Sequence, residues 1–344
     1  MATYQGIHGR PIRAVSADLS GSASEGEVWY NTTTDVLKVM YPFTGWSASD
    51  PTVVARNQAM SCGTVTAGLY FGGAGPGGIA AATMTEEFDG TSWTTVPGVM
   101  GQRRTDAMAF GVQTAAGVLG GRINDGNPGP TYMTVATEEY DGTSWSAGGD
   151  YPLIIVSGGS GGTQTAAFGA TGYTTPGDPG TDTPVSAEYD GSTWTIGNPV
   201  ITARRDVNMG PSGTQTAALM ICGRVAQTHQ NAVEEYDGTS WATVNSTPAT
   251  QRAAMCFGTQ TSTLAGFGHQ GGQGTIVSTC VSYDGTSWAA APSGGTARYS
   301  CSGAGTSATS GINMGGYTMP GYATAGLTEE FAAGGTVVKT ITTS

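Results

Sequence analysis

The chain has 344 residues, of which 56 are glycine, 38% are hydrophobic and only 11% are charged. This composition can bury a core, which excludes a disordered chain, and the abundance of glycine indicates many tight turns. The net charge of −12 at pH 7 argues against nucleic acid as a partner, because binding a phosphate backbone requires a basic surface.

The first fifty residues contain no long apolar segment. Met1 to Arg13 lacks the apolar core of a signal peptide, and no stretch approaches the ~18 apolar residues of a membrane span, so we expect neither a secretion signal nor a membrane partner. Residues 26–46 read GEVWYNTTTDVLKVMYPFTGW. This segment resembles a β-hairpin found in many bacteriophage tail-fibre and other virion proteins. The resemblance implies a short N-terminal β-hairpin or arm.

One sequence unit then repeats along the rest of the chain. A phrase of the type EEYDGTSW recurs at intervals of 47 to 52 residues, and in five of its six copies a tryptophan follows the aromatic residue by five positions. An upstream motif of the type GTQTAA leads into an apolar segment that ends on a glycine, always eight residues after its third position. The repeated aromatic residues are Phe88, Tyr140, Tyr189, Tyr236, Tyr283 and Phe331.

Each unit predicts four short antiparallel strands. The Asp-Gly pair predicts a type I′ hairpin turn, with Thr-Ser-Trp opening the outermost strand. The apolar segment before the glycine predicts a second strand, and no stretch has the 3.6-residue period of a helix. Four strands every ~47 residues form a propeller blade, so the sequence predicts an all-β, six-bladed β-propeller. The innermost strands are expected to begin near Arg56, Arg104, Arg205, Arg252 and Arg298.

The order of apolar strand, glycine pair, variable loop, aromatic residue and tryptophan resembles the kelch repeat of galactose-oxidase-type propellers. The resemblance covers residues 52–341 and departs from the family in its short Y-x4-W hairpin and in the single glycines Gly172, Gly223 and Gly268. Galactose oxidase holds copper through two tyrosines, two histidines and a Tyr–Cys crosslink, and no matching set can be assembled in this sequence. The repeat phrases also resemble open reading frames of bacteriophages, particularly marine ones.

Two segments compete to close the ring. Trp46 lies 47 residues before Trp93, in phase with the repeats, whereas the last unit has Thr336 in place of its tryptophan. One hypothesis is that the strand around Trp46 completes the sixth blade. The alternative is that residues 336–342 do so and residues 1–50 form a separate docking arm. The expected organisation is an arm over residues 1–50 and a propeller over residues 51–344.

One face of the predicted propeller is variable. The turns of the GTQT and DGTS type are nearly copied in every unit, whereas the loops after the second strands differ widely in length and content. A rigid frame with divergent loops on one face is how binding sites are usually built. The first loop residues would surround the channel mouth, and the candidate ligand-binding residues among them are Arg122, Tyr173, Arg224, His269 and Tyr317.

No catalytic or metal site is expected, and no cofactor. His229 and His269 are interpreted as solvated loop residues, and the loop residues Asp125, Asn127, Asp178 and Asp182 as turn formers, because they lack a full calcium-ligand spacing. The repeated glutamates are interpreted as structural partners of the blade-initial arginines, and the repeated tryptophans as packing between blades. The five cysteines are expected to be buried free thiols.

These observations favour a non-enzymatic structural protein of a bacteriophage virion, located on the surface of the particle as a tail, tail-fibre or capsid-decoration component. Residues 1–50 would attach it to other virion proteins, in multiple copies per particle. The variable loops would bind a host-surface glycan or protein during host attachment. The alternative is a glycan-directed enzyme of propeller fold, a depolymerase or hydrolase. That alternative requires acids or histidines that are unique to one blade and gathered at the channel mouth.

Overall fold

The computed structural model describes residues 12–19, 27–76, 82–123, 132–175, 180–207, 213–271, 275–321 and 323–341. Within these ranges every regular element is a strand, which confirms the all-β class. The same ranges contain no helix with the length and apolar character needed to cross a bilayer.

The chain forms two compact units, one made by the chain up to Gly45 together with the segment from Ala332 onward, and one made by residues 46–331. In the first unit, β1 (Arg13–Val15) pairs in parallel with β2 (Val28–Asn31), and β2 forms an antiparallel hairpin with β3 (Val36–Ser49). The side chain of Asn31 shapes the hairpin turn, because its Oδ1 accepts the backbone N–H groups of Thr33 and Thr34 at 3.0 and 3.1 Å.

The second unit consists of sheets that follow the sequence repeat, and we number these blades 1 to 6 in chain order. Each of the first five blades has four antiparallel strands. Blade 6 contains two strands of its own, then β35, and beside β35 the strand β3. From the innermost strand outward, blade 1 consists of β4 (Met60–Thr64), β5 (Ala67–Phe71), β6 (Thr85–Phe88) and β7 (Trp93–Val96), and blade 2 of β8 (Met108–Val112), β9 (Ala115–Leu119), β12 (Thr137–Tyr140) and β13 (Trp145–Ala147). Blade 3 consists of β14 (Gly159–Thr163), β15 (Ala166–Ala170), β16 (Ser186–Tyr189) and β17 (Trp194–Ile196), and blade 4 of β18 (Gly213–Thr214), β19 (Ala217–Ile221), β22 (Val233–Tyr236) and β23 (Trp241–Val244). Blade 5 consists of β25 (Met255–Thr259), β26 (Ser262–Gly266), β28 (Cys280–Tyr283) and β29 (Trp288–Ala291), and blade 6 of β31 (Ser302–Ser307), β32 (Ser310–Met314), β35 (Thr328–Ile341) and β3.

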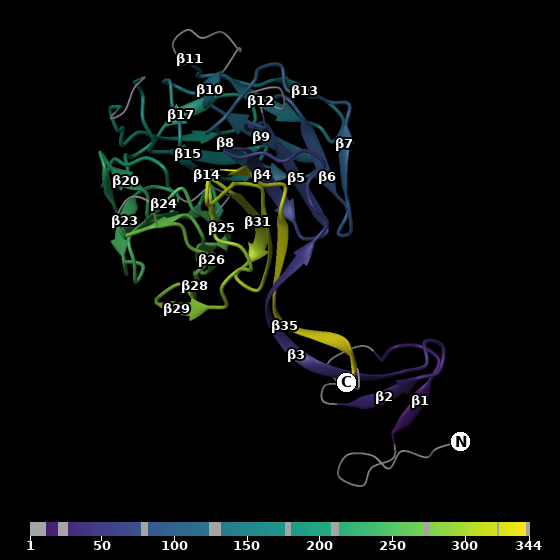
Figure 1. Ribbon diagram of the computed structural model, residues 1–344. Coiled ribbons are helices and arrows are strands. Elements are labelled where there is room, and N and C mark those ends of the chain that lie inside the picture. Colours follow the sequence, from purple (N-terminus) through teal and green to yellow (C-terminus); the bar gives the residue numbers. More distant parts are fainter. Residues whose placement is uncertain are drawn as a thin grey trace. The chain divides into compact units, whose positions relative to one another are not determined.

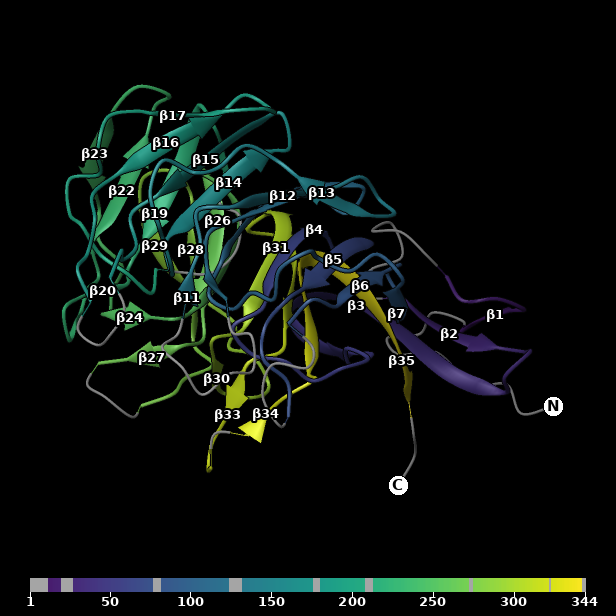
Figure 2. The ribbon, with the colours of Figure 1, turned by 90° about the horizontal axis from the view of Figure 1, so that it is seen from above.

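The innermost strands contact one another in a closed cycle. Strand β4 contacts β8, β8 contacts β14, β14 contacts β18, β18 contacts β25, β25 contacts β31, and β31 contacts β4. Figures 1 and 2 show these strands towards the middle of the second unit and the outer strands, such as β7 and β23, at its edge. The blades therefore surround a common centre.

The repeated phrases are explained by hydrogen bonds between neighbouring blades. The amide of Gln113 in blade 2 donates to the carbonyls of Gly68 and Phe88 in blade 1, at 3.0 and 2.9 Å. Gln164, Gln215 and Gln260 make the same pair of bonds from the next three blades. Each GTQT turn is thus tied to the blade before it.

The Asp-Gly turn differs from its expected form. Tyr140 pairs directly with Trp145, so the loop contains four residues and Thr-Ser belongs to the turn rather than to the outer strand. Asp141 Oδ1 accepts the N–H groups of both Thr143 and Ser144 at 2.8 Å. The predicted type I′ turn was wrong because only the glycine has positive φ, 90° at Gly142, while the aspartate stabilises the turn through its side chain.

Four blades contain a buried ion pair between an arginine and the first glutamate of the EEY phrase. The nitrogen-to-oxygen distance is 2.9 Å in Arg56–Glu86, 2.8 Å in Arg104–Glu138 and 2.6 Å in Arg298–Glu329, and Arg204–Glu234 forms the fourth pair. The structural role predicted for these glutamates is confirmed. In blades 4 and 5 the buried position belongs to Arg204 and Gln251, each one residue before the arginine expected there. Arg205 and Arg252 pair instead with Asp182 and Asp206, so the expected pairing with the repeated glutamates is wrong for these two arginines.

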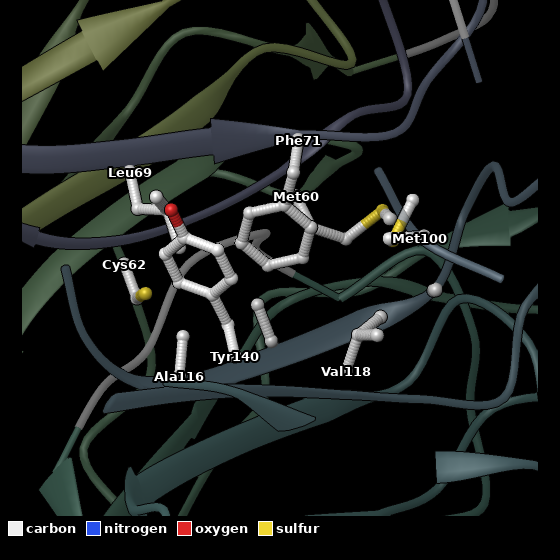
Figure 3. Close-up of a cluster of buried hydrophobic side chains, with 10 residues drawn as sticks. Met60, Cys62, Leu69, Phe71, Met100, Ala116, Val118 and Tyr140 are labelled. Carbon is white, nitrogen blue, oxygen red and sulfur yellow. The ribbon is translucent and has the colours of Figure 1, made fainter. Parts of the chain in front are cut away.

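Tryptophans and aliphatic side chains fill the spaces between blades, as expected. The indole N–H of Trp145 in blade 2 donates to Thr85 Oγ1 in blade 1 at 2.9 Å, and Trp194 reaches Thr137 in the same way. Figure 3 shows one such space, where Met60, Cys62, Leu69 and Phe71 of blade 1 face side chains of blade 2 that include Tyr140. All five cysteines are buried free thiols, which confirms that prediction.

Trp46 has the environment of a blade tryptophan. Its ring lies 5.2 Å from that of Phe331, as Trp145 lies 5.1 Å from Tyr140, and its indole N–H donates to the carbonyl of Pro292 in blade 5 at 3.0 Å. The sequence of strands in this sheet is β3, β35, β32, β31. The end of β3 from Trp46 to Ser49 therefore forms the outer strand of blade 6.

Candidate functional site

The five predicted binding residues occupy equivalent positions in their blades. Each first loop residue pairs with a residue of the segment that enters the same blade, and we call these six pairs the mouth ring. Four of them are isolated bridges, and two belong to short ladders between β24 (Gln251–Arg252) and β27 (His269–Gln270) and between β30 (Arg298–Tyr299) and β33 (Tyr317–Thr318). The pairs are Asn57–Ala74, Thr105–Arg122, Val156–Tyr173, Arg205–Arg224, Arg252–His269 and Tyr299–Tyr317.

The next residue of each entering segment has a left-handed backbone. The φ angles lie between 47° and 55°, although none of the six residues is glycine. Such angles are uncommon for other residues and persist where the surroundings hold them. Here backbone hydrogen bonds do so: Asp106 N–H donates to the Gln58 carbonyl at 3.1 Å, and Ser157 N–H to that of Asp106 at 2.9 Å. The six residues are Gln58, Asp106, Ser157, Asp206, Ala253 and Ser300.

A cavity of about 300 Å³ lies among these residues. Of the predicted site residues, Arg122, Arg224 and Tyr317 line it, whereas Tyr173 and His269 do not. Among the charged and aromatic lining residues, the sequence interpretation missed four: Asp106, Asp206, Arg252 and Tyr299. The signal was present in the sequence, because comparison of the six entering segments position by position shows that only two carry an acid at the left-handed position.

One side of the cavity is charged. Asp206 Oδ2 accepts Arg224 Nε at 2.6 Å and the Nη1 of Arg252 at 3.2 Å. Arg252 Nε also donates to His229 Nε2 at 2.9 Å, which requires this ring nitrogen to be unprotonated. Burial, together with the neighbouring positive charge of Arg252, lowers the pKa of His229.

Asp106 is the second carboxylate of the cavity. The Gln58 amide donates to both of its oxygens at 3.0 and 2.9 Å, and Arg122 Nε lies 3.6 Å from Oδ2. Burial raises the pKa of Asp106 to about 6; the negative charge of Asp206 adds to this effect and Arg122 opposes it. This carboxyl therefore changes its charge close to neutral pH.

Arg122 is held from behind by a chain of contacts. Its Nε donates to the hydroxyl of Tyr173 at 2.6 Å, and the guanidinium of Arg205 stacks on the same tyrosine ring at 4.8 Å. Arg205 in turn donates to Asp182 Oδ1 at 2.6 Å. Tyr173 therefore acts as a support for Arg122 rather than as a lining residue.

The other side of the cavity is aromatic. Tyr299 and Tyr317 are stacked with their ring centres 5.1 Å apart, and His269 packs edge-on against Tyr299 at 4.2 Å. His269 is only 5% exposed and His229 only 8%, so the interpretation of both as solvated loop residues was wrong. Burial and the charge of Arg252 lower the pKa of His269 to about 4, which keeps the ring neutral.

Of the loop acids considered as calcium ligands, Asp182 is paired with Arg205, while Asp125, Asn127 and Asp178 lie outside the described residues. Within the described ranges, no group of three or more His, Cys, Asp or Glu side chains is arranged to hold a metal ion.

No protein-family model matches this sequence, and no curated protein matches it. Among solved structures, the chain is similar to the one titled "Structure of YjhT", a protein of β-propeller type. The TM-score is 0.68 at 13% sequence identity, and the match covers 84% of this chain and 99% of the other. The chain folds as a β-propeller. At this level of identity the likeness extends to the fold alone.

Proposed function

We propose that this β-propeller is a non-enzymatic structural protein of a bacteriophage particle that binds a host-surface ligand at its channel mouth. The observation that carries the binding role is the mouth ring itself. Six equivalent backbone pairs present six different sets of side chains, in a frame where the opposite turns are nearly identical. Divergent side chains on a repeated, rigid frame are suited to recognition.

The location in a virion is supported by sequence. The hairpin of residues 28–39 lies within the segment that resembles tail-fibre and other virion proteins, and the repeat phrases resemble those of phage reading frames. In this proposal, residues 1–50 attach the protein to other virion proteins, and the propeller carries its mouth ring at the particle surface, as a tail, fibre or capsid-decoration component.

A second function, that of a glycan-directed enzyme, is favoured by one specific observation. Asp106 and Asp206 are acids at equivalent positions that the other four blades fill with Gln, Ser, Ala and Ser, and both line the cavity. An acid with a pKa near 6 is suited to general acid catalysis. Against this, the guanidinium groups of Arg224 and Arg252 both already pair with Asp206 Oδ2, so this carboxylate is engaged within the site.

A glycan array followed by an assay for released saccharide separates the two functions. We expect the full chain to bind a defined set of glycans and to leave them intact after prolonged incubation. Asp106→Asn and Asp206→Asn variants should then change affinity only. Release of saccharide by the parent chain that disappears in these variants would establish the enzymatic function instead.

A further inference from the structure

The charges of the mouth do not cancel. Four guanidinium groups, those of Arg122, Arg205, Arg224 and Arg252, face three carboxylates, those of Asp106, Asp182 and Asp206, among the described residues. Both histidines nearby have lowered pKa values and stay neutral. Among these described groups, positive charges therefore exceed negative charges by one, within a chain whose net charge is −12.

The excess charge is located at Arg122. Arg224 and Arg252 share Asp206, and Arg205 is bound to Asp182, with nitrogen-to-oxygen distances of 2.6 to 3.2 Å. Arg122 has the longest of these distances, 3.6 Å to Asp106 Oδ2, and its side chain is 38% exposed, the largest fraction among the four arginines. It lines the cavity and is oriented by Tyr173. An incoming anion would meet this guanidinium first.

The remaining lining defines the rest of the ligand. The stacked pair Tyr299 and Tyr317 offers aromatic surface to an apolar ring face, and Gln58 and the carboxylates can bind several hydroxyl groups. A volume of about 300 Å³ is at the lower end for a small-molecule site, which suits a single sugar ring.

We propose that the cavity binds a sugar ring that carries one carboxylate, with this carboxylate on Arg122, and that it discriminates against the corresponding neutral and amino sugars. This inference rests on the proposed recognition function and names its ligand class. One excess positive charge balances a monoanion. A dianion such as phosphate would bring a second negative charge, which the carboxylates of Asp106 and Asp206 in the cavity lining would repel.

Binding of this anion is coupled to a proton. Asp106 faces Arg122, Gln58, Asp206, Tyr173 and Tyr317, and its pKa of about 6 means that it is ionised at pH 8 and largely protonated at pH 5. Protonation removes a negative charge beside the ligand carboxylate, which itself stays ionised at both pH values. The affinity should therefore rise as the pH falls from 8 to 5.

Isothermal titration of the full chain tests the proposal with D-glucuronate, D-glucose, D-glucosamine and inorganic phosphate as probes. At pH 7 we expect glucuronate to bind about tenfold more tightly than glucose, because a charge-assisted hydrogen bond replaces a neutral one. Glucosamine and phosphate should bind more weakly than glucuronate. Glucuronate should bind several-fold more tightly at pH 5 than at pH 8.

Two variants locate the effect. Arg122→Gln should remove the preference for glucuronate over glucose, whereas Arg103→Gln, which removes a positive charge from an exposed position outside the cavity lining, should keep it. Asp106→Asn should abolish the pH dependence. Equal affinity for glucuronate and glucose, or a preference that survives in Arg122→Gln, would overturn the inference.

Failure of this inference and failure of the proposed function have different signatures. Binding of neutral glycans on the array, without a preference for glucuronate, overturns the ligand class and leaves the recognition function standing. Absence of binding to all four probes also overturns the ligand class, and the array alone then decides on recognition.

Discussion

At the scale of single residues, the site depends on a backbone position that the chain uses six times with different side chains. The left-handed residue of each entering segment lines the cavity, and the chain places Asp there twice, Ser twice, and Gln and Ala once each. Asp is comparatively tolerant of this backbone, but burial penalises its charge. Asp106 therefore lowers stability in its ionised form.

This penalty is measurable as a function of pH. The folded-state pKa of Asp106, about 6, lies above its ordinary value of 3.8, so its contribution favours folding at low pH and is lost as the pH rises through 6. We expect Asp106→Asn to raise the free energy of unfolding by about 3 kcal/mol above pH 7, and to change it little below pH 4, in urea titrations.

Asp190 provides a control of opposite sign. The backbone N–H of Thr193 and the other donors of its turn lower the pKa of this exposed residue. Asp190→Asn should therefore lower stability at neutral pH, and its effect should fade as the pH falls into the acid range. An Asp106→Asn variant that is destabilised at pH 8 would contradict the account of Asp106.

At the scale of elements, the buried ion pair defines what a blade requires. Blades 3 and 5 lack the pair, and each lacks both members: Ile155 and Ala187 stand in blade 3, and Gln251 and Val281 in blade 5. Loss of one partner would leave a charge buried without compensation, whereas replacement of both by neutral groups is often tolerated. The chain itself therefore already carries this double replacement in two of its blades.

Blade 1 can be converted to the form of blade 5. The Arg56 guanidinium donates to the carbonyls of Gly72 and Met84 and pairs with Glu86, and both side chains are fully buried. We expect Glu86→Val alone to lower the free energy of unfolding by about 3–5 kcal/mol. Adding Arg56→Gln should restore a large part of it, because Gln251 also donates to the equivalent carbonyl in blade 5. Urea unfolding of both variants measures this, and additive losses would contradict the account.

The elements also show what the sequence could predict. Strand number, order and the two faces followed from the repeat, because glycine-terminated apolar segments and aspartate turns act locally. The sequence did not show that Arg204 and Gln251, rather than Arg205 and Arg252, are the buried members, because adjacent arginines, or a Gln-Arg pair, look alike in a linear sequence. The buried residue of each pair can be told from the residue at the mouth only by aligning the entering segments with Gly223 and Gly268, whose positive φ marks the same position in each blade.

The site was predicted in part for the same reason. Arg122, Arg224 and Tyr317 were found because loop variation marks the mouth. Asp106 and Asp206 were missed because they lie in the entering segments, which were read as connections between blades. The burial of His229 and His269 depends on contacts between blades, such as that of Arg252 with His229, and no local pattern predicts those.

At the scale of the whole molecule, the mouth exists only if the ring is closed. The contact of β31 with β4 joins the last blade to the first. The outer strand of blade 6 is formed by Trp46 to Ser49, which precede their partner strand β35 by 279 residues (from 49 to 328) in the sequence. Each blade alone is too small to bury a core, so the loss of this strand should be felt by its neighbours.

Thermal unfolding of two truncated chains tests most directly whether the strand of Trp46 closes the ring. A chain of residues 46–331 keeps the strand of Trp46, and a chain of residues 51–331 lacks it; both lack the first unit to the same extent. We predict that the longer chain unfolds cooperatively and binds the same array ligands as the full chain. The shorter chain should unfold at a temperature lower by about 5 °C or more, because it loses a half-buried tryptophan and the outer strand of blade 6. Equal unfolding temperatures for the two would contradict closure of the ring by the N-terminal strand, on which the geometry of the mouth depends.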